Sequence, residues 1–257
     1  MFLVLPVMLV INFSTTASAE WFFGIGTGIY RLNAQGDQGL HTNLLGPVTF
    51  DVDLSPDDID DLMETAFGLG GYATNGKWMI QASFAMLELV DTVGTTLPGG
   101  TSLSAEIGFE ATTAQVIIGY PIYYNESLLI RAHAGARYIG HEVSADLSAT
   151  GANGTFRLVR TVEEDWTDVL LGLTADVPLA EKWTWSTRVD AGFGGSDGTY
   201  FGETGVNWQF HKNWSLNLYG NYLAIEFEEG HKGDPGWYIY DADEFGVGLN
   251  ILFHWGM

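Results

Sequence analysis

Eight charged or titratable side chains recur at alternate positions of segments whose remaining positions are mostly apolar or small. Alternate residues of a strand point to the same face, so these side chains are expected together on one face of neighbouring strands. Cations and carboxylates placed there can pair and hold an interior together, or they can line a water-filled path that selects solutes by charge. The eight candidates are Arg131, His133, Arg137, Asp168, Asp176, Arg188, Asp190 and Glu203.

Carboxylates also gather in two polar segments, one near residues 51–61 and one from about Glu226 to Asp243. Oxygen ligands at this density suit Ca²⁺ or Mg²⁺, although their spacing matches no EF-hand loop. A solvated anionic surface is the alternative, and no resident metal or cofactor is predicted. The candidate cation ligands are Asp57, Asp58, Asp60 and Asp61.

The segments that position these side chains alternate with a period of two, which is typical of β-strands. We expect ten strands, near residues 20–32, 65–74, 77–90, 105–120, 127–145, 168–177, 183–193, 199–210, 214–222 and 244–255. Tight turns alternate with longer connections, among them 33–64, about 148–161 and 226–243. In the first connection, Ser55 followed by Pro56 and two acids predicts a short helix from Pro56 to about Glu64.

The last strand shows where such a sheet resides. Every second residue from Phe245 to Trp255 is apolar, whereas the intervening positions are mostly small or polar. A strand that crosses lipid has this pattern over roughly 9–11 residues. The sequence therefore predicts an all-β protein, a single antiparallel up-and-down transmembrane β-barrel of about ten strands, with eight or twelve as alternatives.

Aromatic residues support this prediction because they cluster beside the tight turns, as an interfacial belt would. They are Trp78, Tyr120, Tyr123, Trp183, Trp185, Trp208, Phe210, Trp214 and Trp255. Residues 1–19 are apolar and close on Ala17-Ser18-Ala19, the pattern of a secretory signal peptide. Residues 20–257 then form one barrel domain in the bacterial outer membrane.

Charge and composition exclude other classes of function. The formal charge of −22 argues against nucleic-acid binding, which requires clustered Lys and Arg. Cysteine is absent, so disulfide and thiolate-metal sites are excluded.

Enzymatic candidates are weak. The pairs His231 with Asp234 and His141 with Glu142 lack the Asp-x-His spacing of outer-membrane barrel proteases. Barrel lipases and acyltransferases use Ser and His near the membrane edge, and the sequence fixes no His as a partner of Ser196 or Ser144. We predict no catalytic activity.

Several motifs give a family resemblance over nearly the whole mature chain. They are Trp166-Thr167-Asp168, the run Trp183–Gly198, Gly135-Ala136-Arg137-Tyr138, the Leu54-Ser55 helix start and the closing F-G-V-G-L-N-I-L-F. In these the chain resembles a group of uncharacterised proteobacterial outer-membrane β-barrel proteins, small and porin-like. The resemblance implies a location in the Gram-negative cell envelope and a fold, but no reaction.

The predicted function is a structural outer-membrane protein or a narrow passive channel for small solutes. The alternative is a surface enzyme, adhesin or ligand-binding barrel that acts through its acidic external loops. Expected partners are outer-membrane lipid and lipopolysaccharide, and the barrel-assembly machinery during insertion.

Overall fold

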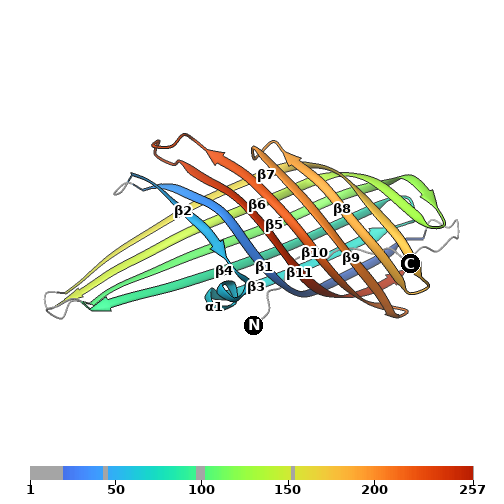
Figure 1. Ribbon diagram of the computed structural model, residues 1–257, viewed down its shortest axis with the longest axis horizontal. Coiled ribbons are helices and arrows are strands. Elements are labelled where there is room, and N and C mark those ends of the chain that lie inside the picture. The colour runs from blue at the N-terminus through green and yellow to red at the C-terminus, as the bar shows by residue number, and fades with distance from the viewer. Residues whose placement is uncertain (1–19, 43–45, 97–101, 152–153, 257) are drawn as a thin grey trace.

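The computed structural model describes residues 20–42, 46–96, 102–151 and 154–256, which form one cylindrical antiparallel sheet with a short helix (Figure 1). Its elements are β1 (Phe22–Thr42), β2 (Gly46–Leu54), α1 (Pro56–Leu62), β3 (Met63–Thr74), β4 (Met79–Thr96), β5 (Ser102–Asn125), β6 (Leu128–Gly151), β7 (Gly154–Ala180), β8 (Trp183–Phe193), β9 (Gly198–His211), β10 (Trp214–Glu229) and β11 (Tyr238–Gly256). The predicted all-β up-and-down barrel is confirmed, as is the helix in the first long connection. No helix in the described ranges is long and apolar enough to cross a membrane. The predicted signal peptide lies outside those ranges.

Strand pairing closes the sheet into a ring. Neighbours pair in chain order from β3 to β11, and β1 joins the two ends. One edge of β1 pairs with β11 along most of its length, starting with Phe22 opposite Gly256. Its other edge pairs with β3 only over Phe22–Gly26 and with β2 over Ala34–Thr42. The described ring therefore has the ten predicted strands, and β2 is an additional strand beside β1.

The two ends of the cylinder differ. Short turns join β3–β4, β5–β6, β7–β8 and β9–β10 at one end, which we call the turn end; the opposite end is the loop end. At the first turn Gly76 has φ +83°, which favours glycine. The side-chain oxygen of Asn75 accepts hydrogen bonds from the backbone N–H of Lys77 at 3.1 Å and of Trp78 at 2.8 Å. Asn-Gly thus forms the tight hairpin that it predicts.

Three predicted connections were wrong in part. Segments 33–64, 148–161 and 226–243 were expected as loops, but β1, β6, β7, β10 and β11 continue into them and β2 lies within the first. These extensions carry mainly polar residues on the outward face, so the outward apolar pattern of a strand that crosses lipid is missing. The hairpins β4–β5 and β6–β7 consequently project far beyond the other strands at the loop end (Figure 1).

The outward face carries a continuous apolar band. Leu218 and Val247, for example, are each 59% exposed. At the turn end the predicted aromatics meet across strands, with ring centroids of Trp183 and Trp208 5.6 Å apart. On the loop side the band gives way to outward carboxylates that lie directly opposite one another on β4, β5, β6 and β7. This row consists of Glu88, Glu110, Glu142 and Glu163.

The inward face is filled by alternate residues. Tyr219 and Tyr30 stack there with ring centroids 6.0 Å apart. A Cβ at Gly248 would lie 2.3 Å from the Tyr219 ring, so only glycine leaves room for that ring. The interior therefore depends on small residues opposite large ones.

Candidate functional site

The charged residues predicted from strand parity meet inside the barrel. Asp190 accepts hydrogen bonds from Arg137 Nη2 at 2.8 Å and from Arg188 Nε at 2.7 Å. His133 Nε2 lies 3.7 Å from Asp190 Oδ2, the oxygen that Arg188 also contacts. All four side chains are buried. β6 positions His133 and Arg137, whereas β8 positions Arg188 and Asp190.

Neutral groups complete this cluster. The guanidinium carbons of Arg137 and Arg188 lie 5.1 and 4.9 Å from the ring centre of Phe201, within the range of cation–π attraction. The side-chain oxygen of Gln115 accepts a hydrogen bond from each guanidinium, at 3.3 Å in both cases. One carboxylate therefore serves two arginines, and the amide and the ring supply the remaining contacts.

A second pair lies on the same inward face. Arg131 Nη1 is 2.5 Å from Asp176 Oδ2, and the Ser186 hydroxyl donates to the other oxygen of that carboxylate, also at 2.5 Å. All three residues are buried. The ion pair is thus held away from solvent, although Arg131 Nε, also buried, has no hydrogen-bond partner among the described residues.

Glu203 and Asp168, the other two predicted carboxylates, lie in surroundings that differ from each other. Glu203 is buried directly opposite Arg188 in the β8–β9 register. Asp168 binds the loop between β8 and β9: it accepts hydrogen bonds from the backbone N–H of Gly195 and Ser196, and from the hydroxyls of Ser196 and Thr199, at 2.7–3.1 Å. Asp168 therefore anchors a loop.

These side chains leave the middle of the barrel and its turn-end half packed. Three asparagines lie opposite one another on β9, β10 and β11, all fully buried. They are Asn207, Asn217 and Asn250. A cavity of about 70 Å³ separates the charged layer from the interior of the loop-end half.

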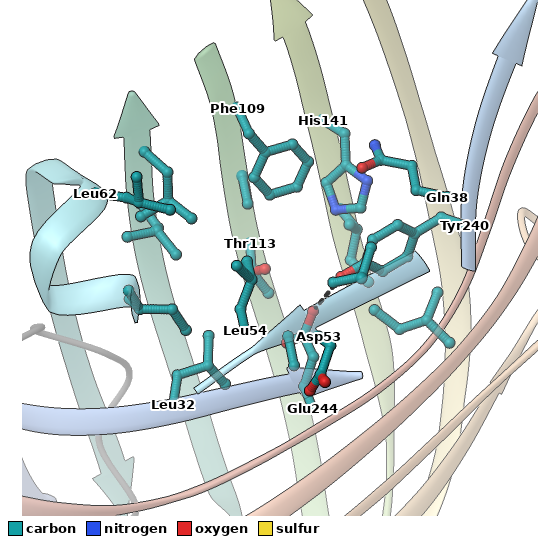
Figure 2. A pocket seen from close by; sticks show the side chains of 18 of the residues that line it. Leu32, Gln38, Asp53, Leu54, Leu62, Phe109, Thr113, His141, Tyr240 and Glu244 are labelled. Carbon is teal, nitrogen blue, oxygen red and sulfur yellow. Dashed lines mark hydrogen bonds between the residues drawn. The ribbon is translucent and has the colours of Figure 1, made fainter. Parts of the chain in front are cut away.

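The loop-end half is hollow instead. A cavity of about 360 Å³ lies there, within the range of roughly 300–1,000 Å³ that is typical of small-molecule sites. Its wall is mainly apolar and comes from β1, β2, α1, β4, β5, β6, β10 and β11. Figure 2 shows Leu32, Leu54 and Leu62 on one side, with Phe109, His141 and Tyr240 on the other. The apolar wall includes Leu32, Leu54, Ile59, Leu62, Leu87, Leu89, Ile107, Phe109, Ile139, Leu223 and Ile225.

The cavity opens sideways between β2 and β4. In the described residues β2 pairs only with β1, and the β3–β4 ladder ends where Met63 faces Leu89. The free edges of β2 and of β4 beyond Leu89 therefore face the same gap. Consecutive residues of β2, Asp51–Leu54, line the cavity although they point to opposite faces. One cavity can touch both faces only where it reaches around a strand edge.

Polar groups in the cavity are few. The Tyr240 hydroxyl donates to Glu244 Oε1 at 2.9 Å (dashed line in Figure 2). His141 Nδ1 lies 2.9 Å from the Tyr238 hydroxyl, which also accepts from Gln38 Nε2 at 2.9 Å. The lining contains carboxylates but neither Lys nor Arg.

Helix α1 forms the floor of the opening. Ser55 caps its N-terminus and Ile59, 2% exposed, packs on Leu32, Leu87 and Leu89. Outside the barrel, Arg31 of β1 forms salt bridges with two acids of the helix.

The predicted cation ligands are used differently. Arg31 Nη2 lies 2.6 Å from Asp57 and 3.2 Å from Asp60. Asp58 is bonded to Ser55 in the capping box, and these hydrogen bonds hold the pKa of Asp58 below its ordinary value. No group of three or more His, Asp or Glu in the described part of the chain is arranged to hold a metal.

The enzymatic candidates are not brought together. His141 is buried in the barrel, whereas Glu142 follows it on the outward face. His231 and Asp234 share a backbone turn hydrogen bond of 2.8 Å. Ser196 is engaged with Asp168.

The cavity itself was missed from sequence. Nothing in the chain signals that the ladder between β1 and β3 covers only Phe22–Gly26, which leaves the edges of β2 and β4 to line the cavity. The available signal was the change of inward residues on β6, from Arg131, His133 and Arg137 to Ile139.

Comparisons with known proteins agree on the fold. No protein-family model matches the sequence, and no curated protein sequence matches it. The chain is similar in structure to the outer membrane protease OmpT from Escherichia coli, with a TM-score of 0.59 and 10% identity, over 94% of this chain and 99% of that one. It is also similar to the translocator domain of the autotransporter NalP from Neisseria meningitidis, with a TM-score of 0.44 and 9% identity, over 92% of this chain and 89% of that one. At 10% identity the likeness to the protease shows the fold alone, which is that of an outer-membrane β-barrel.

Proposed function

We propose that this chain is a non-catalytic barrel of the bacterial outer membrane that binds a small apolar or amphiphilic molecule in its loop-end half. The observation that carries the proposal is the apolar cavity of about 360 Å³ with its lateral opening. The apolar outer band and the aromatic belt support a place in lipid, with the turn end in the periplasm and the loop end outside.

The position of the opening along the barrel axis fits this orientation. An open sheet edge does not occur in hydrocarbon unless it is covered by protein or lines a cavity. β2 begins pairing with β1 at Ala34, beyond the outward Arg31, and the β4 edge becomes free beyond the outward Glu88. The opening would therefore lie just outside the hydrocarbon, at the level of lipid head groups, where an amphiphile could enter.

Binding would be driven by the removal of apolar surface from water. Burial of one methylene contributes about 0.8 kcal/mol, and the costs of immobilising the ligand and its chain reduce the sum. A single chain that fills the cavity thus suffices for useful affinity. A passive channel, in contrast, would require the layer around Asp190 to open, because its side chains are buried and paired.

A pocket-filling variant tests the proposal. Ala111 points inward from β5, opposite Leu87 and His141, so Ala111→Phe should occupy the cavity. Ala114 points outward from the same strand between Phe84 and Tyr138, so Ala114→Phe adds the same ring on the lipid side. The probe is N-phenyl-1-naphthylamine, a neutral apolar fluorophore, added to barrels in phosphatidylcholine nanodiscs, with empty nanodiscs as background.

We expect saturable fluorescence above background for the wild type and Ala114→Phe, and at least about a tenfold weaker response for Ala111→Phe. Both variants should keep the heat-dependent gel mobility of a closed barrel. Equal binding by all three proteins would refute the pocket as the binding site. In planar bilayers the wild type should show no discrete conductance steps, and regular steps would favour the channel instead.

A further inference from the structure

The carboxylates around the cavity share one sign of charge without any basic partner in its wall. Asp51, Asp53 and Asp91 lie exposed at the mouth, and Glu244 projects into the interior from β11. Neither Lys nor Arg lines the cavity, and its one histidine, His141, is bonded to Tyr238. A ligand with a negative head group would therefore meet four carboxylates and no countercharge.

Glu244 is the acid best placed to meet a ligand. Ala34 lies opposite Glu244 on β11 and opposite Leu54 on β2. Two strand spacings of about 4.8 Å each thus place Glu244 roughly 10 Å from the free edge of β2. Its neighbours across this cavity are apolar, and Tyr240 donates the hydrogen bond that its carboxylate accepts. Glu244 also lines the cavity of about 70 Å³ together with Arg137, which interacts with it electrostatically. The wall of the large cavity supplies no cation, so an ammonium bound there would add a countercharge to Glu244.

Aromatic rings stand close to this carboxylate. The ring of Tyr240, which donates to Glu244, lies 4.5 Å from that of His141, and the His141 ring is 5.2 Å from that of Phe109. Tyr240, His141 and Phe109 all line the cavity (Figure 2). The faces of Phe and Tyr rings attract ammonium groups.

We infer that the cavity selects single-chain amphiphiles with a cationic head, such as an alkyl primary amine. The ammonium binds at Glu244 beside Tyr240, and the alkyl chain lies on the apolar wall formed by Leu32, Leu54 and Leu87. The acids at the mouth raise the local concentration of cations. This inference rests on the proposed function, because it names the ligand class of the same cavity.

The test compares three molecules that differ only in the head group. Dodecylamine, 1-dodecanol and dodecanoate each compete with N-phenyl-1-naphthylamine on the wild-type barrel in zwitterionic nanodiscs at neutral pH, where the amine is protonated and the acid ionised. The variant is Glu244→Gln. Its matched control is Asp243→Asn, which alters the adjacent outward residue, bonded to Tyr222.

We expect dodecylamine to displace the probe at least about tenfold better than 1-dodecanol, and dodecanoate to be the weakest of the three. In Glu244→Gln the ratio between amine and alcohol should fall close to one, whereas Asp243→Asn should keep it. A higher salt concentration should weaken probe displacement by dodecylamine more than displacement by 1-dodecanol.

The outcomes separate the two claims. Probe binding that Ala111→Phe abolishes, combined with equal displacement by all three competitors, would overturn the inference about charge and leave the proposed function standing. Preferential binding of dodecanoate would overturn it as well. Probe binding that is insensitive to Ala111→Phe would overturn both.

Discussion

Replacing Asp190 by Asn should destabilise the barrel severely. The substitution keeps the shape of the side chain but removes the negative charge that Arg137 and Arg188 share at 2.8 and 2.6 Å. At such distances and an effective dielectric constant near 20, each contact has a Coulomb energy of about 6 kcal/mol, much of it offset by dehydration. Breaking a buried ion pair typically costs about 3–5 kcal/mol, because a charge is left buried without its partner. We expect Asp190→Asn to lower the free energy of unfolding by about 3–5 kcal/mol.

The assay is equilibrium unfolding by urea in lipid vesicles, followed by tryptophan fluorescence. A loss of this size would shift the midpoint by roughly 1–2.5 M for a slope of about 2–3 kcal/mol/M. Asp146→Asn is the matched control, because Asp146 pairs with the exposed Arg157 on the projecting β6–β7 hairpin. Exposed pairs contribute little, so its midpoint should barely move. If Asp190→Asn were as mild as this control, the interior charges would be solvated, and the channel would become the better hypothesis.

Three further outcomes follow from the structure. Glu110→Gln should stabilise the barrel by about 0.2–1 kcal/mol at low salt, because Glu110 faces carboxylates on both neighbouring strands; Glu163→Gln, at one end of the row, should gain less in the same urea titration. Because Ser55 lowers the pKa of Asp58, the stabilisation from this contact is present above the ordinary carboxyl pKa and is lost as the pH falls through the lowered one. Ser55→Ala should move the Asp58 midpoint upward in an NMR titration, and an unchanged midpoint would contradict the capping geometry. The folded barrel should migrate differently on a gel before and after boiling, and identical mobility would count against a closed cylinder.

Strand parity predicted the interior well, for a physical reason. A barrel wall has one face toward the outside and one toward the lumen, so a period of two separates Arg131, His133 and Arg137 from their apolar neighbours. The structure buries all three as expected. Which carboxylate meets which cation could not be predicted, because that depends on the register between strands. Arg137 lies opposite Asp168 in the β6–β7 register but hydrogen-bonds Asp190 of β8.

Asp168 shows this limit most clearly. Its parity placed it among the lumen charges, and it is indeed fully buried. Its hydrogen bonds nevertheless go to Ser196, Thr199 and the backbone of the β8–β9 loop. Loop residues contact a strand only in three dimensions, so alternation along β7 carries no information about this partner.

The hollow half of the barrel arises from one local feature of the ring. The ladder between β1 and β3 spans only Phe22–Gly26, and beyond it β1 pairs with β2 while α1 contacts both β1 and β4. The wall thus loses its continuous ladder at the level where the inward residues of β6 change from charged to apolar. There β2 and α1 stand in for the ladder, and Leu54, Ile59 and Leu62 line the wall without filling the space inside it. An apolar surface left unfilled lacks partner atoms and forfeits dispersion contacts, so the same break that makes the opening also makes an apolar ligand favourable behind it.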